Sequence, residues 1–163
     1  MNASSSAPIY FDPSQVDGLA SRVLGADGGI FANNPAMCAY VEAAKIWRNE
    51  PVEILVAAFG CGTQKLRYPT SRRWGLLGWT SVFSGIPLLE AMFDGQSQTV
   101  SYQMSRILTP GSFFRFEYDL DGFGKIRMDD AEQDNMDRIV AAADALLATS
   151  QAQQDMQALA EAL

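Results

Sequence analysis

A continuous apolar run from Ile54 to Phe59 places the strongest constraint on how this chain can fold. The run is short, partly β-branched and ended by Gly60, so it predicts an interior strand covered on both faces. It follows a segment with Asn34 as the expected N-cap and Pro35 as the first helical residue. Apolar residues recur at helical spacing from residue 37 to residue 47 and cover most of that surface, so we expect a largely buried helix.

The remaining segments extend this order of helices and strands. Residues 22–24 predict a short strand, whereas Pro8 and Pro13 predict that residues 1–20 are irregular. Helical patterns run from about 81 to 93 and from about 97 to 108. Residues 113–118 alternate apolar with charged side chains, as a half-exposed edge strand does. Helical faces then continue from about residue 139 to the C-terminus, and the order as a whole is typical of an α/β fold.

Charge and hydropathy exclude two classes of partner. The 163 residues suffice for one domain, and 12 basic against 19 acidic side chains give a net charge of −7. We therefore expect no binding to nucleic acid. No apolar run reaches the roughly 18 residues that a membrane span needs, and the first residues lack the pattern of a signal peptide. We expect a cytoplasmic protein that could lie peripherally on a membrane.

The chain contains no histidine, and this excludes more catalytic chemistry than any other residue count. A Ser-His-Asp triad, a Cys-His pair and a two-histidine zinc site all need an imidazole, so acid–base work falls to carboxylates. There is also no phosphate-binding loop and no dinucleotide fingerprint, and we expect no cofactor and no metal. Cys38 and Cys61 lack the spacing of a zinc or redox motif, and we expect buried free thiols.

The stretch from Leu24 to Pro35 reads LGADGGIFANNP and sets one carboxylate before two glycines. An aspartate at the end of a strand, followed by glycines that permit positive φ and a close backbone approach, suits a catalytic site. The alternative is an Asx turn in which Asp27 only accepts hydrogen bonds from the backbone ahead of the helix. The local residues leave both interpretations open.

A basic and aromatic segment follows the apolar strand. It contains Tyr68, Trp74 and Trp79 among the cations Lys65, Arg67, Arg72 and Arg73. Such interleaving could mark a surface that meets anionic headgroups or a partner. The alternative is a solvated loop with structural tryptophans.

Four stretches carry a resemblance to a known family. The segment ADGGIFANNPAMCAYVEA closely resembles the D-G-G-x-x-x-N-N-P region of patatin-like phospholipases, and ASSSAPIYF resembles the segment that precedes it there. The run ILVAAFGCGTQ is similar to the strand of that family ending in S-L-G-T-G, although Gln64 replaces its last glycine. FFRFEYDLDG and the residues after it are similar to the end of bacterial members.

The resemblance implies an α/β fold, namely the C-terminal part of a three-layer α/β/α domain with an incomplete central sheet. It covers residues 1–163, with a helical C-terminal extension from about 131 to 163. It also implies hydrolysis of lipid esters by a Ser-Asp dyad, in which Asp27 is the base and Gly28 and Gly29 form its turn. A carboxylate base fits a chain without histidine.

The chain departs from the family because no G-x-S-x-G segment occurs in it. Cys61 lies between two glycines, but the family has a strand end there, and nothing basic is evident beside it. We therefore expect that this chain alone is inactive. Its incomplete sheet leaves three possibilities open, namely a complementing N-terminal half, self-association, or a compact remnant whose helices rearrange. The alternative is a non-catalytic remnant that acts as a binding module.

Overall fold

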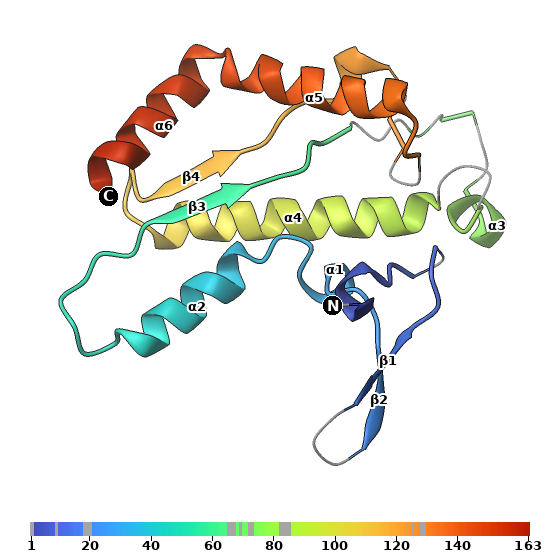
Figure 1. Ribbon diagram of the computed structural model, residues 1–163, viewed down its shortest axis with the longest axis horizontal. Coiled ribbons are helices and arrows are strands. Elements are labelled where there is room, and N and C mark those ends of the chain that lie inside the picture. The colour runs from blue at the N-terminus through green and yellow to red at the C-terminus, as the bar shows by residue number, and fades with distance from the viewer. Residues whose placement is uncertain are drawn as a thin grey trace.

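The computed structural model describes the chain except residues 1, 9, 18–20, 65–67, 69, 72–73, 82–85, 125 and 128–129. Its elements follow one another in a mixed order of helices and strands (Figure 1). They are η1 (Asn2–Ser5), β1 (Ser14–Asp17), β2 (Arg22–Gly25), α1 (Gly29–Ala32), α2 (Ala36–Ile46), β3 (Val56–Phe59), α3 (Leu76–Trp79), α4 (Pro87–Ile107), β4 (Phe113–Phe116), η3 (Asp121–Phe123), α5 (Gln133–Leu147) and α6 (Ser150–Ala162).

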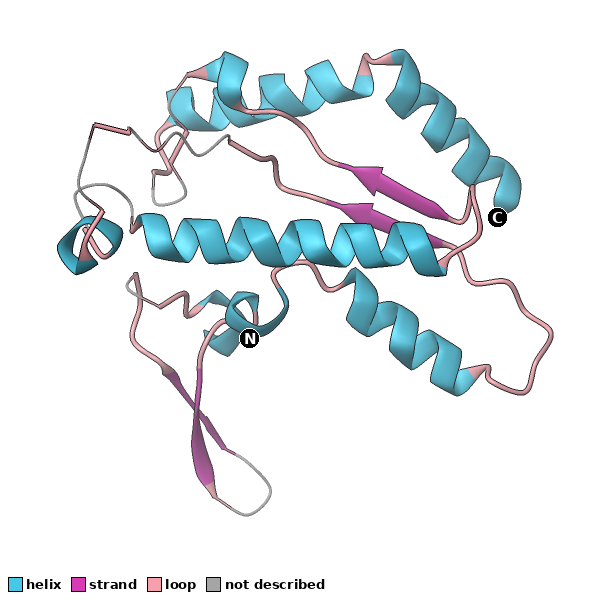
Figure 2. Ribbon diagram, turned by 180° about the vertical axis from the view of Figure 1, so that it is seen from behind, coloured by secondary structure: helices cyan, strands magenta, loops and turns pink. Residues whose placement is uncertain are grey.

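A parallel pair of strands forms the centre of the fold. β3 and β4 pair in register from Val56 opposite Phe113 to Phe59 opposite Phe116, and a bridge from Thr63 to Asp119 continues the pairing. Parallel strands need a long crossover, which α4 supplies. The pair runs between α4 on one side and α5 with α6 on the other (Figures 1 and 2). The expected α/β class is confirmed.

Side chains along β4 alternate between buried and half-buried positions, as the sequence predicts. Phe114 and Phe116 are 6% and 5% exposed, whereas Arg115 between them is half-buried. Met104 of α4 is fully buried and packs in one cluster with Val56 and Ala58 of β3. These side chains join α4 to the strand pair.

β3 differs from the expected interior strand. Among the described residues it pairs only with β4, and Phe59 at its end is 72% exposed. The expectation that α2 is largely buried is also wrong, since Ala36 is its only buried residue and Ile46 is 67% exposed. An apolar sequence provides side chains that can be buried, but the described part of the chain does not supply the surface to cover them.

Two local features differ near the N-terminus. Residues 14–17, expected to be irregular, form β1, which pairs antiparallel with β2. The strand expected at 22–24 therefore exists, but it belongs to a separate hairpin and not to the parallel pair. Pairing with β1 satisfies the backbone hydrogen bonds that an isolated β2 would leave to water.

Helix boundaries shift for physical reasons. The two helical patterns at 81–93 and 97–108 correspond to one 21-residue helix, α4, which begins only at Pro87, and residues 82–85 of the first pattern lie outside the described residues. Gly95 lowers helix stability without ending the helix. Pro35, expected as the first helical residue, is the N-cap of α2. Asn34 still accepts a hydrogen bond from the Ala36 N–H at 3.2 Å, which is the bond expected of a cap. The C-terminal helical faces lie on α5 and α6.

The cysteines and the basic segment give mixed outcomes. Cys38 and Cys61 are free, as expected, but both are exposed and not buried.

The four cations of the basic segment lie outside the described residues. The rings of Tyr68, Trp74 and Trp79 contact one another with centroids 5.2 to 5.5 Å apart, which favours the interpretation as structural aromatic residues. No helix in the described part of the chain has the length and apolar character to cross a membrane.

Candidate active site

The Asp27 turn has the hydrogen bond of an Asx turn, and the catalytic interpretation of Asp27 stays a prediction. Asp27 is half-buried, and its Oδ1 accepts a hydrogen bond from the Gly29 N–H at 2.7 Å, which is an Asx turn. The Asp27 N–H donates to the Ser6 carbonyl at 3.1 Å. Within the described residues, no hydrogen bond involves the second carboxylate oxygen. One oxygen is therefore fixed while the other can accept a proton.

Gly28 and Gly29 do not both have the features that the sequence predicts, namely positive φ and a close backbone approach. Among the described glycines, positive φ occurs at Gly62, Gly111 and Gly124, but neither at Gly28 nor at Gly29. A Cβ on Gly28 would meet no atom within 4 Å, whereas one on Gly29 would lie 3.2 Å from Asp27 Oδ1. The expected positive φ is therefore wrong, and a close approach exists only at Gly29. The Asx turn is built from ordinary right-handed backbone, so it does not need positive φ.

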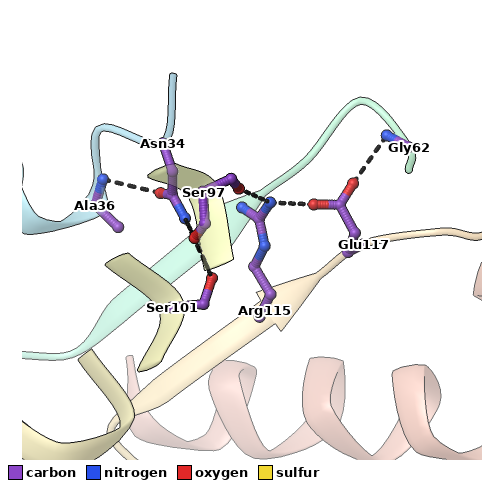
Figure 3. A network of polar contacts seen from close by, with 7 residues as sticks. All are labelled: Asn34, Ala36, Gly62, Ser97, Ser101, Arg115 and Glu117. Carbon is purple, nitrogen blue, oxygen red and sulfur yellow. Dashed lines mark hydrogen bonds and ion pairs between the residues drawn. The ribbon is translucent and has the colours of Figure 1, made fainter. Parts of the chain in front are cut away.

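The second half of the motif ties this turn to α4 (Figure 3). Asn34 is 3% exposed, and its Nδ2 donates to the Ser97 carbonyl and to Ser101 Oγ, each at 3.3 Å. The Asn33 N–H donates to Gln96 Oε1 at 2.8 Å. Helix α4 therefore positions the segment that begins at Asp27.

The same network continues to the carboxyl ends of the parallel strands. Arg115 Nη2 lies 3.5 Å from Ser97 Oγ and forms an ion pair with Glu117, which accepts a hydrogen bond from the Gly62 N–H at 2.9 Å (Figure 3). Both side chains of the ion pair are about four-fifths buried, at 22% and 21% exposure. The pair thus joins the end of β4 to the glycine turn after β3.

A cleft of about 850 Å³ opens at this edge. Open α/β sheets bind ligands outside the carboxyl ends of their strands, and this cleft has that position. Asp27 is not among the described residues that line it. Those residues are Thr63, Gln64, Tyr68, Ala91, Asp94, Gly95, Ser97, Gln98, Ser101, Arg115 and Glu117.

Tyr118 and Cys61 lie beside this edge. Burial raises the pKa of the Tyr118 hydroxyl, and the nearby Cys61 and Glu117 raise it further. A Cβ on Gly62 would lie 2.7 Å from the Tyr118 ring, so the turn packs tightly against it. Cys61 is exposed, and no hydrogen bond to it is found among the described residues. The described residues contain no group of three or more acidic or cysteine side chains that could hold a metal.

Fold and cleft together define a mixed α/β chain with a polar edge at the carboxyl ends of two parallel strands. No family model matches the chain. It is 24% identical over 159 residues to patatin-like protein 2 of Oryza sativa subsp. japonica, covering 85% of this chain and 39% of that protein. It is 26% identical over 169 residues to patatin-like protein 3 of Arabidopsis thaliana, covering 89% of this chain and 40% of that protein. A phospholipase A I of Arabidopsis thaliana is 36% identical over 91 residues, or 56% of this chain and 6% of that protein.

These relatives support the patatin-like family for this chain, as its motifs predict. The chain spans about two fifths of the length of the patatin-like proteins that it matches. The assignment of Asp27, Gly28 and Gly29 stays a prediction.

Sequence reasoning missed the residues that hold the site together. Gln96 and Ser101 occupy ordinary helical positions, and Arg115 and Glu117 read as the exposed face of an edge strand. Asn34 was expected only as a helix cap. The two consecutive asparagines were a usable signal, because asparagine has low helix propensity and its amide often bonds to backbone.

Proposed function

We propose that this chain is the aspartate-bearing portion of a patatin-like lipid acyl hydrolase, with Asp27 as the base of a Ser-Asp dyad. The observation that carries the proposal is the state of the Asp27 carboxylate. One oxygen accepts the Gly29 N–H, and the other has no partner within the described residues. A relative named phospholipase A I supports lipid esters as the substrate class.

The reaction is acyl transfer in two stages. The serine hydroxyl attacks the ester carbonyl while the Asp27 carboxylate takes its proton, and a tetrahedral intermediate forms. When the intermediate collapses, the bond to the alcohol oxygen breaks and that oxygen takes the proton from Asp27. The alcohol leaves, and the acyl group stays on the serine. Water then attacks the acyl group in the same way and releases the fatty acid. The Gly29 N–H holds the carboxylate in one orientation throughout.

The serine has to come from a segment outside the 163 residues, which contain no G-x-S-x-G. The chain alone is therefore inactive toward esters, because a base without a nucleophile offers no covalent route. In this proposal residues 1–163 are the C-terminal part of the domain, and α5 and α6 form a helical extension from about residue 131. A complementing N-terminal half covers the exposed apolar side chains of α2 and β3.

The test is an esterase assay with a short-chain p-nitrophenyl ester. The chain is assayed alone and mixed with an N-terminal half of a patatin-like protein that carries the serine. We expect turnover only in the mixture, and its loss with Asp27→Asn. Asp17→Asn is the matched control, since that exposed carboxylate contacts only Arg22 of the hairpin among the described residues.

Two results would contradict the proposal. Turnover by the chain alone that disappears with Cys61→Ser would make the thiol the nucleophile. The second result is a mixture without turnover, when circular dichroism shows that the chain is folded and the N-terminal half is active with its own partner. That result would favour the non-catalytic binding module.

A further inference from the structure

Helix α1 lacks the packing that normally fixes a helix in place. None of its four residues is buried, and Phe31 is 81% exposed while Ile30 is 49% exposed. Asp27 is part of the same small unit, because the Ile30 N–H donates to its carbonyl at 3.3 Å and the Gly29 N–H to its carboxylate. The orientation of the carboxylate therefore depends on polar contacts that hold this unit.

One polar contact holds the beginning of the unit. The Asp27 N–H donates to the carbonyl of Ser6, which is itself 5% exposed. This bond and the short link to β2, which ends at Gly25, fix the beginning of the unit, so the far end of α1 needs a contact of its own.

Gln96 of α4 makes that contact at the far end of α1. Its Oε1 accepts the N–H of Asn33 at 2.8 Å, and its Nε2 lies 3.5 Å from the carbonyl of Ile30. One half-buried amide thus satisfies a donor and an acceptor that the end of a short helix leaves unpaired. Asn34, the residue after Asn33, is bound to Ser97 by its own side chain. The contact at the far end of α1 is therefore made by Gln96.

We propose that Gln96 is a positioning residue for Asp27, because its side-chain amide fixes α1 against α4 and so fixes the direction of the carboxylate. The effect on catalysis rests on the proposed function, but the effect on the turn does not. Gln96 itself touches no reacting atom.

Hydrogen exchange measured by NMR on the whole chain tests the effect on the turn. We expect Gln96→Ala to speed exchange of the Asn33 amide about fivefold, since a lost hydrogen bond of about 1 kcal/mol corresponds to that factor. The Gly29 amide should also exchange faster, because it reports the orientation of Asp27. Gln96→Glu keeps the acceptor and should keep the protection of Asn33.

Gln103→Ala is the matched control, because Gln103 lies on the same helix and is exposed. It should leave both amides unchanged. Equal exchange at Asn33 and Gly29 in Gln96→Ala and Gln103→Ala would overturn the proposal. Circular dichroism shows whether Gln96→Ala still folds, and loss of Asn33 protection in a folded Gln96→Glu would also count against the proposal.

The mixture with the serine-bearing half tests the effect on catalysis. A residue that orients a base changes kcat and leaves substrate binding alone, so Gln96→Ala should lower kcat about tenfold at unchanged KM. Gln96→Glu should recover part of kcat. A wild-type mixture without turnover contradicts the proposed function, and the exchange experiment then still decides whether Gln96 holds the turn. A working mixture in which Gln96→Ala keeps the wild-type kcat overturns the positioning role.

Discussion

The side chain of Asn34 donates a hydrogen bond to the Ser97 carbonyl, which lies 63 residues further along the chain. The same amide donates to Ser101 Oγ and accepts the Ala36 N–H, and it is buried. This one side chain therefore starts α2, contacts α4 and fixes the segment after Asp27. Its neighbour Asn33 is exposed and bonds to α4 through its backbone only.

The asparagine pair supplies a matched test of stability. Asn34→Ala leaves buried polar groups without partners and should lower the free energy of unfolding by about 1 to 3 kcal/mol. Asn33→Ala should change it by less than about 0.5 kcal/mol. Urea denaturation followed by circular dichroism measures both. Equal effects of the two variants would show that the Asn34 network adds nothing to stability.

The stacked pair of Phe59 and Phe116 allows a second comparison. The rings lie 4.9 Å apart, but Phe116 is 5% exposed and Phe59 is 72% exposed. Phe116→Ala opens a cavity between β4 and its neighbours and should cost about 3 to 5 kcal/mol. Phe59→Ala loses mainly the ring contact, worth about 1 kcal/mol. A loss from Phe59→Ala as large as that from Phe116→Ala would mean that Phe59 is covered in solution.

The glycines after β3 and within α4 should respond with opposite signs. Gly62 has φ +94°, and its Cβ would lie 2.7 Å from the Tyr118 ring, so Gly62→Ala should destabilise by about 2 kcal/mol or more. A Cβ on Gly95 meets no atom within 4 Å, and alanine there should stabilise the helix by about 1 kcal/mol. Thermal unfolding of both variants measures the difference. A stable Gly62→Ala would contradict the tight turn.

The raised pKa of Tyr118 predicts a dependence on pH. Its folded pKa lies above the unfolded value of about 10, so the folded state favours the neutral hydroxyl. This stability is fully present below pH 10 and is lost as the pH rises through the folded pKa. The pKa of Tyr68 is raised as well, so absorbance near 295 nm should show more than one late-titrating tyrosine, and Tyr118→Phe should remove one of them. Cys61→Ser should lower the pKa of Tyr118, because it removes a nearby negative charge, and an unchanged titration would rule out that contact.

The two glycines of the proposed catalytic turn should differ in the complemented enzyme. Gly29→Ala places a Cβ 3.2 Å from Asp27 Oδ1 and should turn the carboxylate, which lowers kcat about tenfold or more. Gly28→Ala meets nothing within 4 Å and should keep most of kcat. Steady-state kinetics of the mixture decides between them. If Gly28→Ala were the more damaging change, the incoming half would have to approach the turn at Gly28.

The sequence alone determined what depends on neighbours along the chain. The alternation of Phe114 and Phe116 with charged residues predicted β4, and Asp27 before two glycines predicted a turn. Helical spacing predicted α2, the C-terminal helices, and α4 as two separate helices. Absence of histidine limited the chemistry to carboxylates, and the D-G-G-x-x-x-N-N-P pattern indicated the family that the relatives support. Each of these signals is local, because periodicity and turn chemistry act over a few residues.

Contacts between groups far apart along the chain follow from the packing of whole elements, which the local sequence does not predict. Pairing turned residues 14–17 into β1, and the same arrangement left α2 and Phe59 exposed despite their apolar sequence. It also gave Asn34, Gln96 and the Arg115–Glu117 pair their partners, and it showed that Gly28 and Gly29 do not use positive φ. The physical reason is that burial and side-chain hydrogen bonds depend on surfaces supplied by distant segments, and local pattern carries no record of those surfaces.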